Sequence, residues 1–312
     1  MPASVAAEPA ADVALGSDAV AWPPRERVML WPGDPPGVAS PPPRPDSEMR
    51  GDPGRREIQL RGVATPMLYV FRPARPSGVA LLAAPGGGYE FLAASNEGLH
   101  VAETLRALGY TVFVLIYRLP AEGWADRADV PLQGAQRAIR LIRAGAVDYG
   151  IDPGRVGIVG FSAGGHVAAS LAVGAGERVY APVDDADRLP VRPDFAGLLY
   201  AVTTLRAPET HQGSRDHLLG PDPSSALVDR RSPVLHVDAR TPPSFLLHAL
   251  DDTIVPPACS LDWLAACRAA GVPVEAHLIE RGGHGFGTGL PPANPGSLWP
   301  ALFDRWIAAR TA

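Results

Sequence analysis

Residues 156–172 read VGIVGFSAGGHVAASLA, and this segment gives the clearest indication of the fold class. Its first six residues are apolar or glycine, a pattern typical of a strand that is buried on both faces. The residues after Ser162 are mostly small, which suits a helix lying close to that strand. Between the two segments, Gly160-Phe161-Ser162-Ala163-Gly164 matches G-x-S-x-G, which puts a serine on a sharp strand-to-helix turn. We therefore predict a buried strand, a tight turn that presents Ser162, and a closely packed helix.

The same alternation of strand and helix continues on both sides of this stretch. Helical patterns run over 96–108, 131–149, 256–270 and 298–310. From residue 79 onward the strand candidates are mostly continuous in apolar character, as expected in a mainly parallel sheet. The chain is thus predicted to form an α/β fold, with a single twisted, mainly parallel sheet of about eight strands and helices on both faces. The predicted strands are 57–63, 67–72, 79–84, 111–117, 156–161, 195–202, 244–249 and 274–279.

Composition separates the first 50 residues from the rest of the chain. Prolines recur there at 23–24, 35–36 and 41–43, which predicts an arm over residues 1–50 that is partly extended or disordered. The α/β domain is predicted to span 51–312. Two loop-rich insertions, 174–193 and 203–243, are candidates for shaping a pocket. On the predicted helix 131–149, we expect the arginines to form a solvated face: Arg137, Arg140 and Arg143.

Charge and residue usage exclude several function classes. All 28 basic side chains are arginines, so chemistry that needs a lysine amine is excluded. The net charge of −5, without long basic runs, argues against nucleic-acid binding. No apolar run approaches the ~20 residues of a transmembrane helix. Cys259 and Cys267 would lie ~12 Å apart on one helix, too far for a disulfide, so both are predicted to be unpaired.

The first 22 residues hold three acidic side chains and no basic one. They lack the basic start and long apolar stretch of an intact signal peptide. The sequence therefore leaves the location of the protein undetermined, and we favour the cytoplasm. If a leader has been removed, the protein would be secreted or periplasmic.

A serine hydroxyl is a weak nucleophile until a base takes its proton. His284 is the favoured base, because its glycine-rich surroundings follow the last predicted strand. His166 and His248 are predicted to be packing histidines. An acid must then hold the base in the correct tautomer, and Asp251 and Asp252 directly follow the strand 244–249. The chain order Ser162, Asp252, His284 is the order found in α/β-hydrolases.

Residues Ala84-Pro85-Gly86-Gly87-Gly88-Tyr89 follow another predicted strand. Three consecutive glycines let backbone N–H groups approach a substrate closely, as in an oxyanion loop. The second donor would be the N–H of Ala163. A phosphate-binding loop is the alternative, but the G-x-G-x-x-G spacing is missing.

Together these residues resemble the esterase/lipase branch of the α/β-hydrolases, in particular the acetylxylan-esterase-like bacterial carboxylesterases. The resemblance covers roughly residues 30–312. It implies an α/β-hydrolase catalytic domain, with Ser162 as nucleophile, Asp252 as acid and His284 as base. It also implies oxyanion donors at Gly87, Gly88 and Ala163. The segments that carry it include Tyr117-Arg118-Leu119-Pro120, Gly160-Phe161-Ser162-Ala163-Gly164-Gly165-His166, Thr241-Pro242-Pro243 and Gly282-Gly283-His284-Gly285-Phe286.

The expected function is a serine carboxylesterase that hydrolyses short-chain acetyl esters of carbohydrates, such as acetylated xylo-oligosaccharides, through an acyl-enzyme. The expected partner is a small-molecule ester, with no cofactor, metal, nucleic acid or membrane involved. Three alternatives stay open. They are a peptidase on the same fold, an acyltransferase, and a non-catalytic binding protein on a hydrolase scaffold.

Overall fold

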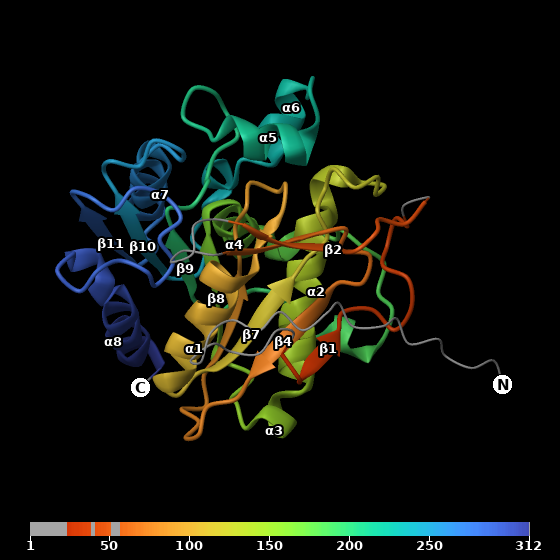
Figure 1. The fold of residues 1–312 in the computed structure, drawn as a ribbon, viewed down its shortest axis with the longest axis horizontal. Helices are drawn as coiled ribbons and strands as arrows, with labels where there is room; N and C mark the ends of the chain where they lie inside the picture. Colours follow the sequence, from red (N-terminus) through yellow and green to blue (C-terminus); the bar gives the residue numbers. More distant parts are fainter. Residues whose placement is uncertain (1–23, 39–40, 51–56, 312) are drawn as a thin grey trace.

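The structure, a computed structural model, describes residues 24–38, 41–50 and 57–311. Its centre is an eight-stranded sheet in the order β1-β4-β7-β5-β8-β9-β10-β11 (Figure 1). Neighbouring strands from β7 to β11 are parallel, whereas β4 is antiparallel to both of its neighbours. The predicted fold class, a mainly parallel sheet of about eight strands, is confirmed.

The strand bounds follow the continuous apolar runs of the sequence. Every residue of β5, β7, β8 and β10 is buried, because helices cover both faces. The strands of the main sheet are β1 (Arg27–Met29), β4 (Met67–Phe71), β5 (Ala80–Ala84), β7 (Thr111–Ile116), β8 (Val156–Phe161), β9 (Ala196–Leu199), β10 (Ser244–Ala249) and β11 (Val274–Ile279).

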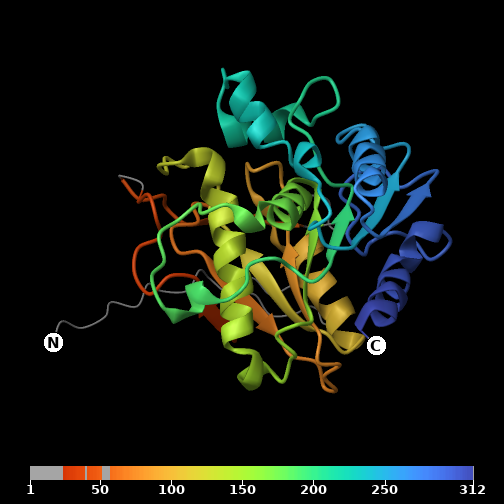
Figure 2. The same cartoon turned by 180° about the vertical axis from the view of Figure 1, so that it is seen from behind.

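Helices α2 and α4 pack on one face of the sheet (Figure 2), and α1 and α8 pack on the other (Figure 1). Helices α5 and α6 lie beyond the carboxyl ends of the parallel strands (Figure 1). The α-helices are α1 (His100–Ala107), α2 (Val130–Ala144), α3 (Ala146–Tyr149), α4 (Ser162–Val173), α5 (Gln212–Leu219), α6 (Ser225–Arg230), α7 (Ala258–Ala269) and α8 (Trp299–Thr311). The shorter helical turns are η1 (Ala94–Leu99), η2 (Arg127–Asp129), η3 (Gly174–Gly176), η4 (Asp185–Arg188), η5 (Pro233–His236) and η6 (Pro295–Leu298).

One strand predicted for the main sheet belongs elsewhere. β3 (Glu57–Arg61) joins β2 (Asp46–Arg50) and β6 (Leu92–Ala93) in a separate three-stranded sheet. The main sheet instead gains β1, whose residues lie within the predicted arm and pair with β4. The boundary at residue 50 stays a prediction, and residues 1–23 of the arm lie outside the described residues. The fold therefore contains a small three-stranded sheet besides the single sheet that the sequence predicts.

The expected solvated arginine face on α2 is wrong. Arg137 is 2% exposed and Arg143 is 8% exposed. The guanidinium of Arg137 pairs with Asp184 and Asp187, and that of Arg143 pairs with Asp194. These carboxylates come from the segment 174–194, which crosses α2 and covers the arginines.

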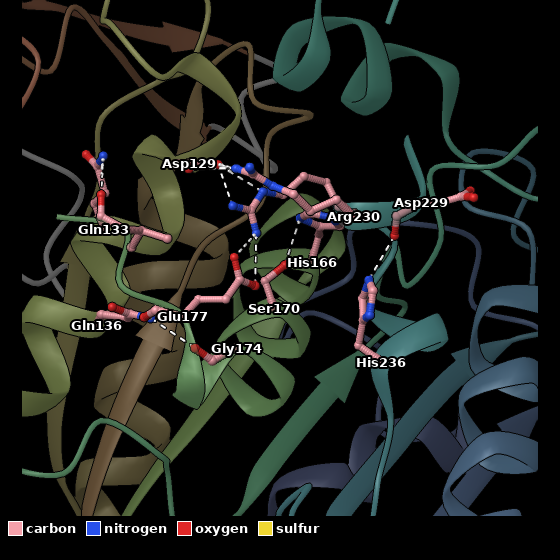
Figure 3. Close-up of polar contacts among 12 residues, drawn as sticks. Asp129, Gln133, Gln136, His166, Ser170, Gly174, Glu177, Asp229, Arg230 and His236 are labelled. Carbon is pink, nitrogen blue, oxygen red and sulfur yellow. Dashed lines mark hydrogen bonds and ion pairs between the residues drawn. The ribbon is translucent and has the colours of Figure 1, made fainter. Parts of the chain in front are cut away.

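A second group of ion pairs, centred on the buried Arg231, attaches the insertion 203–243 to the body. Arg231, at the end of α6, pairs with Asp129 before α2 and with Glu177 after α4. Arg230 pairs with the same Asp129 (Figure 3). The insertion is therefore fixed over the carboxyl ends of the central strands.

Both cysteines are unpaired and buried on α7, as predicted. In the part of the chain that the structure describes, no helix has the length and apolar character needed to span a bilayer.

Candidate active site

Ser162 lies on the turn between β8 and α4. Its φ is +53°, in the left-handed region that non-glycine residues adopt rarely, and its side chain is almost fully buried. The flanking glycines make this turn possible. A Cβ at Gly160 would collide with the carbonyl oxygen of Gly164, and a Cβ at Gly164 would collide with the carbonyl oxygen of Ala84. The strained turn thus holds the hydroxyl at the carboxyl end of the sheet.

The structure brings the three predicted side chains together. The Nε2 atom of His284 lies 2.8 Å from the Ser162 Oγ, and its Nδ1 atom lies 2.6 Å from the Asp252 Oδ2. Ser162 follows β8, Asp252 follows β10 and His284 follows β11. Carboxyl ends of parallel strands meet at one edge of the sheet, which explains how residues so distant in sequence converge.

The Asp252 carboxylate is held from both sides. Its Oδ1 accepts hydrogen bonds from the N–H groups of Ile254 (2.8 Å) and Val255 (3.0 Å). Its Oδ2 is shared between His284 and His248, whose Nε2 lies 3.2 Å away. Burial opposes ionisation of Asp252, but the hydrogen bonds from the two histidines hold its pKa well below the usual value. Asp252 is therefore an anion that can orient and stabilise a charged imidazole.

Asp251, the other candidate acid, supports the backbone instead. Its Oδ1 accepts the N–H groups of Gly282 and Gly283, both at 2.8 Å. These hydrogen bonds lower the pKa of the exposed Asp251 carboxyl. Asp251 thus fastens the loop that carries His284, while Asp252 contacts its ring.

The glycine loop, residues 85–89, follows β5 and faces Ser162. Gly87 and Gly88 line the same cavity as Ser162 and have φ values of +116° and +64°, which glycine tolerates. The carbonyl of Gly87 accepts the N–H of Phe91 (3.2 Å), so the loop is tightly turned. Ala163 follows Ser162 in the first turn of α4, where backbone N–H groups have no acceptor within the helix. The predicted donor positions thus lie around the hydroxyl, while their role stays a prediction.

His166 anchors the glycine loop rather than serving as the base. Its Nε2 lies 2.8 Å from the carbonyl oxygen of Arg231, and its Nδ1 lies 2.7 Å from the hydroxyl of Tyr89. A carbonyl only accepts, so the Nε2 carries the proton and the Nδ1 accepts from Tyr89. Burial lowers the pKa of His166 to about 4, which keeps the ring neutral. Figure 3 shows this ring next to Ser170 on α4.

A cavity of about 750 Å³ opens at the predicted nucleophile. Its lining is rich in polar side chains, with some apolar ones such as Phe91 and Leu290. The polar residues include Glu57, Gln59, Glu90, Asn96, His100 and His211. His211 caps the start of α5 and lines the cavity.

Sequence reasoning missed three groups beside the predicted relay. His248 was predicted to be a satisfied core histidine, and it is fully buried but also contacts the acid Asp252. Glu97 is a buried carboxyl that accepts the N–H of Gly86, and Tyr200 packs against the His284 ring. Only Glu97 could have been found from the sequence. It is an acidic residue among the apolar positions of the predicted helix 96–108, where a buried carboxyl requires a partner.

Glu57 supplies a pH-dependent contribution to stability. Burial raises its pKa to about 7, against 4.5 in an unfolded chain. The folded protein therefore binds this proton more tightly, and the stabilisation is present below about pH 4.5 and lost as the pH rises through about 7. We expect Glu57→Gln to remove up to about 3 kcal/mol of this pH-dependent change in the free energy of unfolding.

The measurement is denaturant unfolding of wild type and Glu57→Gln at pH 4.5 and pH 8.5. Glu280, whose side chain is 85% exposed, supplies the control variant Glu280→Gln. Equal pH dependence of stability in all three proteins would show that Glu57 does not hold its proton in the folded state.

The order of the main sheet and the strained serine turn after β8 define the class of protein, an α/β-hydrolase. A protein-family model, BD-FAE, matches residues 79–265, more than half of the chain. The chain belongs to the BD-FAE family. The resemblance inferred from the sequence is thereby confirmed.

Named relatives agree with this placement. The chain is 33% identical over 226 residues to the acetylxylan esterase of Xylanibacter ruminicola, covering 71% of this chain and 44% of that protein. It is 35% identical over 206 residues to the endo-1,4-beta-xylanase B of Butyrivibrio fibrisolvens, covering 66% of this chain and 32% of that one. The chain thus spans less than half the length of these two relatives.

Among solved structures, the acetyl ester-xyloside bifunctional hydrolase of Caldicellulosiruptor lactoaceticus is similar to this chain over almost its whole length. The TM-score is 0.73 at 32% identity, and the match covers 92% of this chain and 97% of that one. The fold described above therefore belongs to a known group of hydrolases.

Proposed function

We propose that the chain is a serine carboxylesterase that hydrolyses short-chain, acetyl-type esters. One observation carries the proposal: the unbroken relay from the Ser162 Oγ through the His284 ring to the Asp252 carboxylate, with distances of 2.8 and 2.6 Å. This geometry is what an activated serine nucleophile requires. The family membership and the similarity to carboxylic ester hydrolases support it.

The reaction proceeds in two halves. The Nε2 of His284 takes the Ser162 proton as the Oγ attacks the ester carbonyl carbon. Backbone N–H groups of Gly87 or Gly88 and of Ala163 hold the negative charge on the carbonyl oxygen. The imidazolium, stabilised by Asp252, then gives its proton to the departing alcohol. Water repeats the sequence on the acyl-enzyme, which releases the acid and restores Ser162.

The proposed substrate class is an acetylated carbohydrate, such as an acetylated xylo-oligosaccharide. Support comes from the similarity to an acetylxylan esterase and to an acetyl ester-xyloside bifunctional hydrolase. The cavity adds a second argument, because carboxylate, amide and imidazole groups at Glu57, Gln59, Asn96 and His100 suit a hydroxyl-rich alcohol.

A panel of esters from acetyl to octanoyl, with acetylated xylose included, tests the substrate class. We expect kcat/KM to be highest for acetyl and to fall along the series, and acetylated xylose to be deacetylated. A value of kcat/KM that rises with chain length would contradict the acetyl assignment. A peptide amide of matched size tests the peptidase alternative and should remain intact.

Two further alternatives are separated by simple assays. Product analysis in the presence of a sugar acceptor distinguishes hydrolysis from acyl transfer. A fluorophosphonate, which reacts with activated serines, should label the purified protein. Absence of labelling would favour a non-catalytic binding protein on this scaffold.

A further inference from the structure

The π-helical segment η1 (Ala94–Leu99) lies between the two loops that flank Ser162. One is the glycine loop, residues 85–89, and the other, residues 280–287, carries His284 and is called here the histidine loop. The side-chain amide of Asn96 in η1 donates to the carbonyl of Gly285 at 2.6 Å. π-Helical turns in proteins occur frequently at functional sites. The segment is therefore placed to set the distance between the two loops.

Glu97, the next residue of η1, is buried, with 3% of its surface exposed. It forms two hydrogen bonds that link the two loops. Its Oε2 accepts the N–H of Gly86 at 2.7 Å, and its Oε1 accepts the hydroxyl of Tyr200 at 2.9 Å. Among the described residues no arginine is one of the groups that act on the Glu97 carboxyl. Burial raises the pKa of Glu97, and the hydrogen bond from Gly86 opposes this. A buried carboxyl without an arginine partner is costly, which points to a role for its two hydrogen bonds.

Tyr200 continues the link from the carboxyl end of β9. Its φ is +37° and its side chain is fully buried. Its hydroxyl oxygen accepts the N–H of Gly287 at 2.9 Å, and its ring packs edge-on against the His284 ring with 5.0 Å between centroids. Tyr200 thus contacts the histidine loop through both its ring and its hydroxyl.

The donor and the acceptor in each of these hydrogen bonds can be assigned. Gly287 can only donate through its N–H, so the Tyr200 hydroxyl keeps its proton for Glu97. Glu97 therefore receives two donors on its two oxygens. A glutamine has one acceptor oxygen and one NH₂ group, so it cannot accept both the Gly86 N–H and the Tyr200 hydroxyl in this arrangement.

We propose that Glu97 and Tyr200 act as one pair of positioning residues, which couples the glycine loop to the histidine loop and so fixes the oxyanion donors relative to the base. The inference rests on the proposed function, since it concerns the geometry of that reaction. Neither side chain takes part in a proton transfer. Because misplacement by about 1 Å can cost about a hundredfold in rate, breaking the link should slow the chemical step more than it weakens binding.

The test compares Glu97→Gln, Tyr200→Phe and the double variant with wild type on a small acetyl ester. We expect kcat to fall about tenfold to a hundredfold in each single variant, with KM changed by less than about threefold. The double variant should be no slower than the worse single variant, because both changes break one link. Rates that fall by the product of the single effects, or a KM change without a kcat change, would overturn the pairing.

Glu122 provides a matched control. It is also a carboxylate that holds backbone N–H groups, those of Gly62 and Val63, but it does not line the cavity. Glu122→Gln should lower the melting temperature and leave kcat within about threefold of wild type. An equal loss of kcat in Glu122→Gln would show that the Glu97 effect is only structural.

The rate of fluorophosphonate labelling at Ser162 gives a readout that does not need the right ester. We expect the labelling rate to fall in Glu97→Gln and Tyr200→Phe alike. A wild-type protein that is labelled but hydrolyses no ester would overturn the proposed function alone. Full labelling rates in both folded variants would overturn the positioning role alone, and a wild-type protein that is not labelled would overturn both.

Discussion

Replacing Ser162 by alanine is expected to lower kcat for a short-chain aryl acetate by at least about 10⁵-fold. The variant has no oxygen 2.8 Å from the His284 Nε2, so the proton relay has no nucleophile to activate. No acyl-enzyme can form. What remains are the oxyanion donors and substrate binding, which alone accelerate a reaction over water by only about 10³–10⁴-fold. Initial rates, together with loss of fluorophosphonate labelling, measure the effect.

The matched control is Ser170→Ala on the same helix. Ser170 is also buried, but its hydroxyl lies near His166 and not near the cavity. This variant should keep kcat within about threefold of wild type, and both variants should show cooperative unfolding. Substantial activity in a folded Ser162→Ala protein would remove the nucleophile from the proposal and leave the relay without a function.

Much of the fold could be predicted because its strands are continuous apolar runs. β8 and β10 were predicted residue for residue, and every residue of both strands is buried. β3 was misplaced for the opposite reason. Its sequence Glu57-Ile58-Gln59-Leu60-Arg61 alternates, which suits a strand with one buried face in the small sheet. β1 has only three residues and lies among prolines, so no periodic signal marks it.

The predicted relay was accessible from sequence because each of its members follows a strand in a recognisable local pattern. The supporting residues were not, because their partners come from distant parts of the chain. Glu97 meets Tyr200 across 103 positions, and Tyr200 meets Gly287 across 87. The same reason explains Arg137, whose position on α2 suits solvent until the segment carrying Asp184 is folded over it. Local periodicity cannot report partners that only the tertiary fold supplies.

Replacing Asp252 by asparagine is expected to lower kcat by about 10⁴-fold. The orientation of the new amide is set by its neighbours. The N–H groups of Ile254 and Val255 need an acceptor where the Asp252 Oδ1 lies, so the asparagine oxygen takes that place. Its NH₂ group then faces the His284 Nδ1 and makes that atom an acceptor. The proton must move to the Nε2, which can no longer take the Ser162 proton.

Asp251→Asn is the matched comparison, one residue away. The Asp251 Oδ1 accepts the N–H groups of Gly282 and Gly283, and an asparagine oxygen can accept both in the same place. Its kcat should stay within about fivefold of wild type, because neither the His284 tautomer nor the charge beside the imidazole changes. Steady-state kinetics of both variants on one acetyl ester decide between the two carboxylates. A large loss of kcat in Asp251→Asn, together with an active Asp252→Asn, would mean that Asp251 is the functional carboxylate. The 2.6 Å contact between Asp252 and the His284 Nδ1 would then not be needed for catalysis.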